Sequence, residues 1–329
     1  MSKVDAVETA KENVLIRAGA CCITVLPHLG GKIASIRVKD RELLQVPLAP
    51  LGPRTRNMRF DSGDASGWDE CLPSVAQCTV ETAAGPAEIP DHGDLWRVGW
   101  KRQGSGDEAD ASVTLIGECF SLPLALERSL ALTETQTGWK LSLHYTLTNF
   151  GRDSVPWCWA AHPSFAAEAG DRILLQSSIH SLRLEGSGGG RLGKGGACVH
   201  WPIADLMGGG RTDLSVGQPA ASGIGDKLFA GPLNALQNWC ALERPRAGVR
   251  IKVSFDPGAT PYLGLWICFG GWPERPGPKQ MCVALEPTTA PVDSLAITGP
   301  WSRMLAPAES FSWPMNVEID SISRVNGNA

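Results

Sequence analysis

The sequence has no apolar run long enough to cross a membrane. The longest such runs, at residues 263–269 and 282–285, fall far short of the roughly 18 residues that a spanning helix needs. The amino-terminal residues MSKVDAVETAKENV contain no apolar core of the kind found in export signals. We therefore expect a cytoplasmic protein that makes no contact with membranes.

A strong excess of one charge is also absent. The chain has 30 Lys and Arg residues against 34 Asp and Glu residues, which gives a net charge of −4 at pH 7. So small a net charge gives no electrostatic reason to expect a nucleic-acid partner. The 10 cysteines form no CxxC pair, and in a reducing cytoplasm we expect most of them to be buried free thiols.

No amphipathic pattern of helical period extends over 12 or more residues, so the strand–helix alternation of a parallel α/β sheet is missing. Alternation of apolar and polar residues is instead clear at 139–147 and 249–255. No Pro/Ser-rich or charged linker divides the chain. We predict an all-β protein, a large antiparallel β-sandwich that forms a single domain over residues 1–329 with its core at about 15–320. Shorter alternating stretches occur at 22–25, 33–38, 113–116 and 173–175.

Patterns for metals and phosphates are missing as well. The six histidines form no HxH, HxxxH or HExxH motif, so we expect no metal, and no other cofactor is required for the chemistry considered below. The segment GKGG at 193–196 departs from a phosphate loop because Lys194 is followed by Gly and no helix pattern follows. We interpret the Gly-rich segments 186–196 and 208–210 as long loops.

Two strand ends carry titratable side chains in a repeated setting. His162 in VPWCWAAHPS and Glu286 in MCVALEP each share a strand face with small residues, and each is followed by Pro. Proline holds the preceding residue in extended backbone and removes a ladder N–H, so both residues are expected where a strand ends. An imidazole and a carboxylate are the minimal pair for moving a proton onto one atom and off another near neutral pH. The structural alternatives are a hydrogen-bonded core histidine and a solvated glutamate.

Two further segments, DHGDLW at 91–96 and SGWDECLPS at 66–74, offer binding groups. In the first, Gly93 permits a tight turn, and a tryptophan offers a flat apolar face on which a sugar can stack. The second is a loop between a glycine and a proline. For both segments the structural alternative is a turn whose Asp caps its own backbone. The candidate binding residues are His92, Asp94, Trp96, Trp68 and Asp69.

Taken in order, GWDECLPS, HGDLW, WAAHPSF followed by GDRI, and ALEPTTAPVD resemble the aldose 1-epimerase family over roughly residues 15–320. The resemblance implies the galactose-mutarotase-like supersandwich fold and a cofactor-independent mutarotase. In that family a His protonates the ring oxygen of a pyranose while a Glu removes the proton of the anomeric hydroxyl, so that the ring opens and recloses as the other anomer. By motif, His162 matches the acid and Glu286 matches the base.

The resemblance also implies binding residues. His92 resembles the histidine that contacts the substrate near the ring oxygen, and Asp226 in GDKLF resembles an acidic residue that binds sugar hydroxyls. Lys227 stands where many members have His, and small residues replace the Asn-rich surroundings of the acid His. The family's Asn-Arg substrate pair has no clear counterpart in PRTRNMRFD, whose candidates are Arg56, Arg54, Asn57 and Arg59.

A small sugar is the expected partner, and three other functions stay open. A phosphosugar mutarotase would need a basic cluster around the phosphate. A carbohydrate-binding sensor would keep the cleft without the need for both proton-transfer groups. A lyase or glycoside hydrolase acting on a polymer usually carries an additional catalytic domain. The basic residues considered for a phosphate are Arg54, Arg56, Arg59, Arg191 and Lys194.

Overall fold

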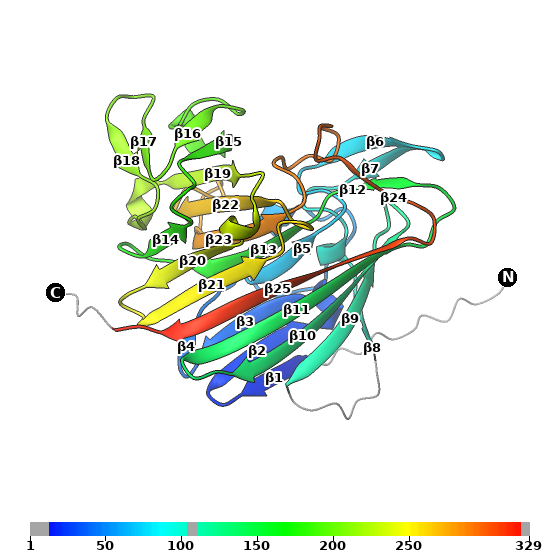
Figure 1. The fold of residues 1–329 in the computed structure, drawn as a ribbon, viewed down its shortest axis with the longest axis horizontal. Helices are drawn as coiled ribbons and strands as arrows, with labels where there is room; N and C mark the ends of the chain where they lie inside the picture. Colours follow the sequence, from blue (N-terminus) through cyan, green and yellow to red (C-terminus); the bar gives the residue numbers. More distant parts are fainter. Residues whose placement is uncertain (1–12, 104–110, 324–329) are drawn as a thin grey trace.

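A computed structural model describes residues 13–103 and 111–323, and antiparallel strands dominate this part of the chain (Figure 1). One sheet has eleven strands in the order β1 (Val14–Ala18), β2 (Cys21–Leu26), β3 (Lys32–Val38), β5 (Trp68–Cys71), β13 (Ala160–Ala166), β23 (Met281–Thr288), β22 (Tyr262–Phe269), β19 (Ile224–Ala230), β15 (Ser181–Ser187) and β16 (Cys198–His200), with β4 (Arg41–Glu42) on β3. The second sheet has eight strands in the order β14 (Arg172–Leu175), β20 (Trp239–Arg244), β21 (Val249–Phe255), β25 (Ser310–Ser321), β11 (Gly138–Asn149), β10 (Leu124–Glu134), β9 (Ser112–Glu118) and β8 (Lys101–Gln103).

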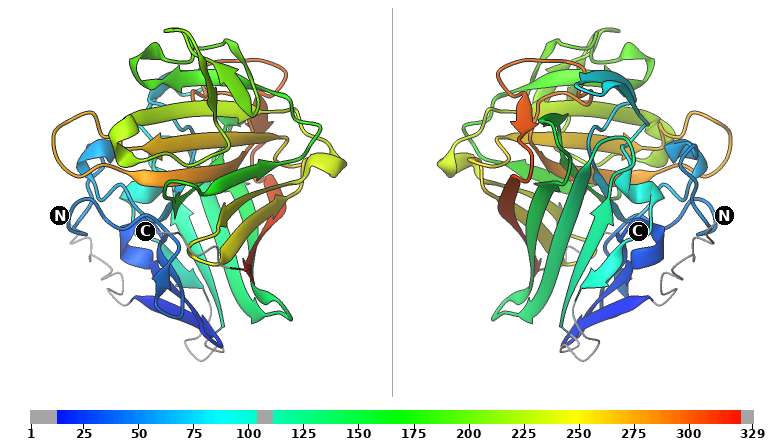
Figure 2. Two further views of the ribbon diagram at one scale, coloured as in Figure 1. Left: turned by 90° about the vertical axis from the view of Figure 1, so that its left-hand side faces the viewer. Right: turned by 90° about the vertical axis from the view of Figure 1, so that its right-hand side faces the viewer.

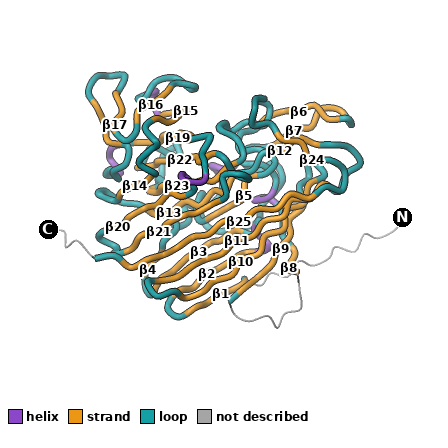
Figure 3. Tube along the Cα trace, in the orientation of Figure 1, coloured by secondary structure: helices purple, strands orange, loops and turns teal. Residues whose placement is uncertain are grey.

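The remaining elements are short. Three two-stranded sheets pair β12 (Val155–Trp157) with β24 (Arg303–Leu305), β17 (Ile203–Asp205) with β18 (Arg211–Asp213), and β6 (Cys78–Thr82) with β7 (Gly85–Ile89). Helices in the described residues are limited to single 3₁₀ turns (Figure 3), and none is long and apolar enough to span a bilayer. They are η1 (Pro27–Leu29), η2 (Phe60–Ser62), η3 (Leu95–Arg97), η4 (Gly188–Gly190), η5 (Ala220–Ser222) and η6 (Ala235–Gln237).

The predicted all-β class is confirmed, and the strands fall where apolar and polar residues alternate. β11 contains the alternating stretch 139–147, and β21 coincides with 249–255. On β11, Leu141, Leu143 and Tyr145 are buried while the intervening side chains are partly or fully exposed. The four shorter stretches lie within β2, β3, β9 and β14. Side chains that alternate across a pleated strand therefore account for the placement of these strands.

The two large sheets pack against each other and bury one apolar core between them (Figure 2). Ile23 and Ile36 of the larger sheet belong to the same buried cluster as Leu126, Leu141 and Val253 of the smaller one. At one end of the sandwich β1 contacts β9 and β10. Removal of these side chains from water is the main favourable term for such a fold. The 10 cysteines, all within the described residues, are unpaired, and seven are buried.

A buried ion pair connects the sheets inside this core. Glu70 on β5 and Arg128 on β10 are both fully buried, and Arg128 Nη1 donates a hydrogen bond to Glu70 Oε1 at 2.9 Å. The Tyr145 hydroxyl donates to the same oxygen at 3.1 Å, and Trp159 Nε1 donates to Oε2 at 3.0 Å. Three donors thus satisfy both oxygens of this fully buried carboxylate, which is the condition under which a buried carboxylate is tolerated.

We predict that Arg128→Met destabilises the fold by about 3–5 kcal/mol, because it leaves the Glu70 carboxylate buried without a cation. Urea denaturation followed by intrinsic fluorescence measures the change. The control is Arg37→Met, which removes an exposed arginine from β3 of the same sandwich. A loss of stability no larger than that of the control would contradict the role of the ion pair.

Candidate active site

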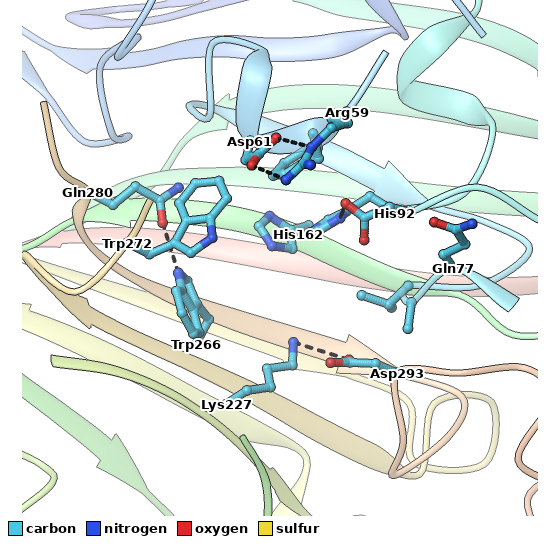
Figure 4. Close-up of a pocket in the computed structure, with 14 residues that line it drawn as sticks. Arg59, Asp61, Gln77, His92, His162, Lys227, Trp266, Trp272, Gln280 and Asp293 are labelled. Atoms are coloured by element: carbon cyan, nitrogen blue, oxygen red, sulfur yellow. Dashed lines mark hydrogen bonds and ion pairs between the residues drawn. The ribbon is translucent and has the colours of Figure 1, made fainter. Parts of the chain in front are cut away.

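A cavity of about 590 Å³ lies on the face of the larger sheet that points away from the sandwich core (Figure 4). Side chains from β13, β19 and β22 form its floor. Residues from η2, the 75–77 segment before β6, the 91–92 turn, the loop between β22 and β23 and the loop after β23 form its wall. Its volume falls in the range of small-molecule sites. The lining residues on which the following argument depends are Phe60, His92, His162, Lys227, Trp266, Trp272 and Asp293.

The register of β13 and β23 brings His162 and Glu286 together. These strands are antiparallel, and Ser164 on β13 pairs with Ala284 on β23. Two residues further along each strand, His162 therefore lies opposite Glu286. Leu285, which precedes Glu286 on β23, belongs to the core cluster. Because side chains alternate along a strand, Glu286 points to the opposite side, toward the cavity. Nε2 of His162 is 3.8 Å from Oε1 of Glu286. His162 lines the cavity, while the Glu286 carboxylate lies just behind the wall.

Burial controls the charge of His162. Its side chain is 8% exposed, and desolvation lowers the pKa of His162 to about 4, against the opposing effect of the nearby Glu286 carboxylate. The imidazole is therefore neutral at pH 7 in the free protein. A ligand oxygen that accepts a hydrogen bond from the protonated ring would favour the charged form.

Lys227 extends from β19 into the same cavity. Its Nζ contacts Glu286 Oε2 and lies 3.7 Å from Asp293 Oδ1, and Figure 4 shows the lysine and Asp293 pointing toward each other. Burial alone would lower the pKa of Lys227, but the carboxylates of Asp293 and Glu286 raise it above its ordinary value. Lys227 is thus a fixed positive charge between two carboxylates.

The turn at 91–93 places His92 in the cavity. His92 and Gly93 both have left-handed backbone, with φ of 60° and 67°. A Cβ on Gly93 would lie 2.1 Å from the Leu72 carbonyl oxygen, so only glycine fits there. The His92 ring stacks on Phe60 with centroids 3.7 Å apart and lies 5.4 Å from the His162 ring. Strained backbone of this kind is concentrated at functional sites.

Three aromatic rings give the cavity apolar faces. Phe60, Trp266 and Trp272 all line it, and Trp266 Nε1 donates a hydrogen bond to Gln280 Oε1 at 2.9 Å. The centroid of Phe60 lies 6.3 Å from that of Trp272. Rings held in this way offer flat surfaces for the C–H face of a sugar, beside polar groups that can bind hydroxyls.

Strand alternation explains why Trp68 and Asp226 lie elsewhere. On β5, Trp68 points into the core and is fully buried. On β19, Leu228 belongs to the core cluster, so Asp226 shares its face and Lys227 takes the opposite one. Asp226 accepts hydrogen bonds from Ser187 Oγ and from the Arg191 guanidinium.

The other predicted binding residues also lie outside the cavity wall. Asp69 is buried beside the Lys32 ammonium, 2.7 Å away, and Arg54, whose Nη1 is 3.4 Å away. Asp94 accepts hydrogen bonds from the backbone N–H groups of residues 120 and 121 at 3.0 and 2.8 Å and so holds that loop. Trp96 is buried against the edge of Phe60, and Arg56 covers the Phe120 ring.

Sequence reasoning passed over several cavity residues. In the sequence Lys227 stands out only as a departure from the family pattern. It follows Asp226 directly, however, and on an alternating strand the side chains of two adjacent residues point to opposite faces of the sheet. Asp293 lies at the end of the motif ALEPTTAPVD. Phe60 and Trp272 lie in loops and turns, where no periodicity indicates direction. Among the described residues no group of three or more His, Cys, Asp or Glu is arranged to hold a metal ion.

Solved structures share this architecture. The Slr1438 protein of Synechocystis sp. PCC 6803 aligns with a TM-score of 0.68 and 16% identity, over 98% of this chain and 100% of its own. A galactose mutarotase-like protein from Lactobacillus casei ATCC 334 aligns with a TM-score of 0.65 and 16% identity, over 94% and 100%. The GalM/aldose epimerase homologue from C. elegans aligns with a TM-score of 0.65 and 10% identity, over 95% and 100%. The chain has the galactose mutarotase-like fold.

This result confirms the fold that the sequence motifs implied. No family model matches the chain, and no curated protein matches it in sequence. At identities of 10–16% the mutarotase-like structures show the fold alone.

We predict that His162 makes stability depend on pH. Above pH 6.5 the histidine is neutral in both states, but as the pH falls toward 4 only the unfolded chain binds the proton, so the folded state loses stability. The loss is up to about 3 kcal/mol, because each pKa unit corresponds to about 1.4 kcal/mol. Urea denaturation between pH 7 and pH 4 should show a smaller loss for His162→Asn than for wild type. The control is Ser164→Ala, because Ser164 lies on the same face of β13 as His162. This variant should keep the wild-type dependence of the free energy of unfolding on pH.

Proposed function

We propose that this protein interconverts the anomers of a free, uncharged aldose by acid–base opening of the ring, without a cofactor. The observation that carries the proposal is the pairing of His162 with Glu286 across two strands, with 3.8 Å between Nε2 and Oε1. His162 lines an aromatic cavity, and the Glu286 carboxylate lies directly behind it. The ring oxygen and the anomeric hydroxyl are bonded to the same carbon, so two such groups can serve both at once. The fold shared with an aldose epimerase homologue supports this choice of reaction.

The proposed steps balance in protons. His162 takes up a proton from solvent when the sugar's ring oxygen is bound, since that oxygen accepts a hydrogen bond from the charged ring. Glu286 then accepts the proton of the anomeric hydroxyl while the His162 imidazolium gives its proton to the ring oxygen, and the bond between the anomeric carbon and the ring oxygen breaks to leave an aldehyde. Rotation about the adjoining carbon–carbon bond presents the other face of the aldehyde, and the reverse transfers close the ring. His92, 5.4 Å from the His162 ring, is placed to contact the sugar beside its ring oxygen.

The charges of the cavity favour a neutral sugar. Lys227 is matched by carboxylates, and Arg59 donates to Asp61 through two hydrogen bonds of 2.9 and 2.6 Å. The lining carboxylates also include Asp91 and Asp293. A phosphorylated sugar would therefore meet no unmatched lysine or arginine in this wall. Of the basic residues considered for a phosphate, Arg59 lines the cavity. The other four do not line it: Arg54, Arg56, Arg191 and Lys194.

The single-domain organisation is part of this proposal, because both large sheets contribute to one apolar cluster. The site then depends on residues that lie far apart in the sequence. A sensor that binds sugar without turnover is the second candidate, since the aromatic rings would serve binding equally well. Within the described residues Oε1 of Glu286 has no hydrogen-bond partner, and its place beside His162 supports the enzyme, because the two supply a proton acceptor next to a proton donor.

The reaction is tested by NMR exchange between anomers over a panel of free aldoses and their phosphates, after exhaustive EDTA treatment of the protein. We expect catalysed exchange for at least one free aldose and none for its phosphate. Catalysed exchange for phosphorylated sugars alone would show that the substrate is a phosphosugar and not a neutral aldose. Binding without exchange throughout the panel would overturn the enzyme in favour of the sensor.

We predict that Glu286→Gln and His162→Asn each lower turnover by roughly 10²-fold to 10⁴-fold, the usual contribution of a positioned acid or base. Sugar affinity should change much less, because the aromatic rings are retained. The double variant should lose far less than the product of the two single losses, since both residues serve one step.

The matched control for these variants is Glu318→Gln, on β25 of the other sheet, which should keep wild-type turnover. Melting temperatures of all variants separate catalysis from folding. Near-wild-type turnover in a folded Glu286→Gln protein would refute the assignment of the base.

A further inference from the structure

Lys227 is a buried charge that the acid–base pair by itself does not require. The residue is 8% exposed, and its ammonium lies between the carboxylates of Glu286 and Asp293. A buried ammonium is costly unless it is paired, and removal of one partner leaves the other charge uncompensated. The position of Lys227 therefore has consequences for Glu286.

The two oxygens of the Glu286 carboxylate have different surroundings. Oε2 accepts a hydrogen bond from Lys227 Nζ. Oε1 has no hydrogen-bond partner within the described part of the chain, and it is the oxygen that lies 3.8 Å from His162 Nε2. Lys227 thus leaves available only the oxygen that faces the proposed acid.

A missing side chain makes this contact possible. β22 lies between β19 and β23, and its Gly264 pairs with Glu286 on one side and Phe229 on the other. A Cβ on Gly264 would lie 3.0 Å from Glu286 Oε2. Lys227 on β19 pairs with Trp266 on β22, and Gly264 lies two residues before Trp266 on the same face. The lysine side chain can therefore extend over Gly264, which has no side chain, to reach Glu286 on β23.

We propose that Lys227 is a positioning residue for the proton acceptor: it holds Oε2 of Glu286, places a cation against the carboxylate, and presents Oε1 to the anomeric hydroxyl. The catalytic part of this inference rests on the proposed function. The ionic part does not, because the three charged groups are together in the free protein.

The groups that face Glu286 leave Lys227 as its main source of positive charge. His162 is neutral at pH 7, and the second carboxylate near Glu286 is Asp293, whose pKa is raised by burial and by the Glu286 charge. Two cysteines nearby have pKa values raised by burial and stay neutral thiols. Without the ammonium, the protonated form of a buried carboxylate is favoured. The facing groups are Lys227 on β19, His162 on β13, Asp293 after β23, Cys71 on β5 and Cys282 on β23.

The catalytic part is tested with Lys227→Met and Lys227→Arg in the anomer-exchange assay as a function of pH. In Lys227→Met the acidic limb of the kcat profile should move to higher pH by about one unit or more, which lowers kcat about 10-fold on that limb, while KM changes less. Lys227→Arg keeps the charge and should restore the position of the limb. The control Lys252→Met removes another ion-paired lysine, on β21, and should leave the profile unchanged.

The ionic part is tested by the stability of a double-mutant cycle, whatever the sugar. Lys227→Met should lower the urea midpoint at pH 7, and the added Glu286→Gln should recover much of that loss, because it removes the uncompensated carboxylate. Lys227→Gln provides a second variant if Lys227→Met does not fold.

The outcomes are distinguishable. A wild-type protein that exchanges no anomers refutes the proposed function, and the stability cycle still tests the ion pair. An active wild type with an unshifted profile in folded Lys227→Met refutes the positioning role. Absence of recovery in the double variant refutes the coupling of Lys227 to Glu286.

Discussion

The two-residue alternation of side chains across the larger sheet is the constraint on which the rest of the structure depends. One face of β13, β19, β22 and β23 packs on the smaller sheet and contributes to the core. The other face is therefore free to carry His162, Lys227 and Glu286 in register. A shift of one residue in any of these strands would exchange core and site, so the packing of the core also determines the geometry of the site.

Buried charge is tolerated in this protein because it occurs in matched groups. Glu70 is paired with Arg128 inside the sandwich, and Asp69 is paired with Lys32. The pair of Lys227 and Glu286 follows the same rule but differs in one respect, since one carboxylate oxygen is left without a partner among the described residues. An unpaired acceptor in a water-poor site is costly for stability and useful for chemistry, which is why such groups are concentrated at functional sites.

Much of the fold could be predicted from local pattern. The stretches 139–147 and 249–255 read directly as strands, because the pleat forces a period of two whatever the tertiary structure. His162 and Glu286 could be selected as a pair, since small neighbours and a following proline are local features. The positions of Trp68, Asp226 and Asp94 relative to the cavity could not be predicted in the same way. Each is a plausible binding residue by type, and only its strand face or its hydrogen-bond partners show that it lies outside the cavity wall.

The sequence by itself determined the strand class, the alternation within each strand and the identity of the proposed proton-transfer groups, because these properties reside in neighbouring residues. Only the tertiary structure decided which strands lie side by side and how they are aligned. That alignment sets His162 opposite Glu286 and lets Lys227 reach the carboxylate across Gly264. Contacts between residues more than 50 positions apart depend on the packing of both sheets, and no local pattern specifies them.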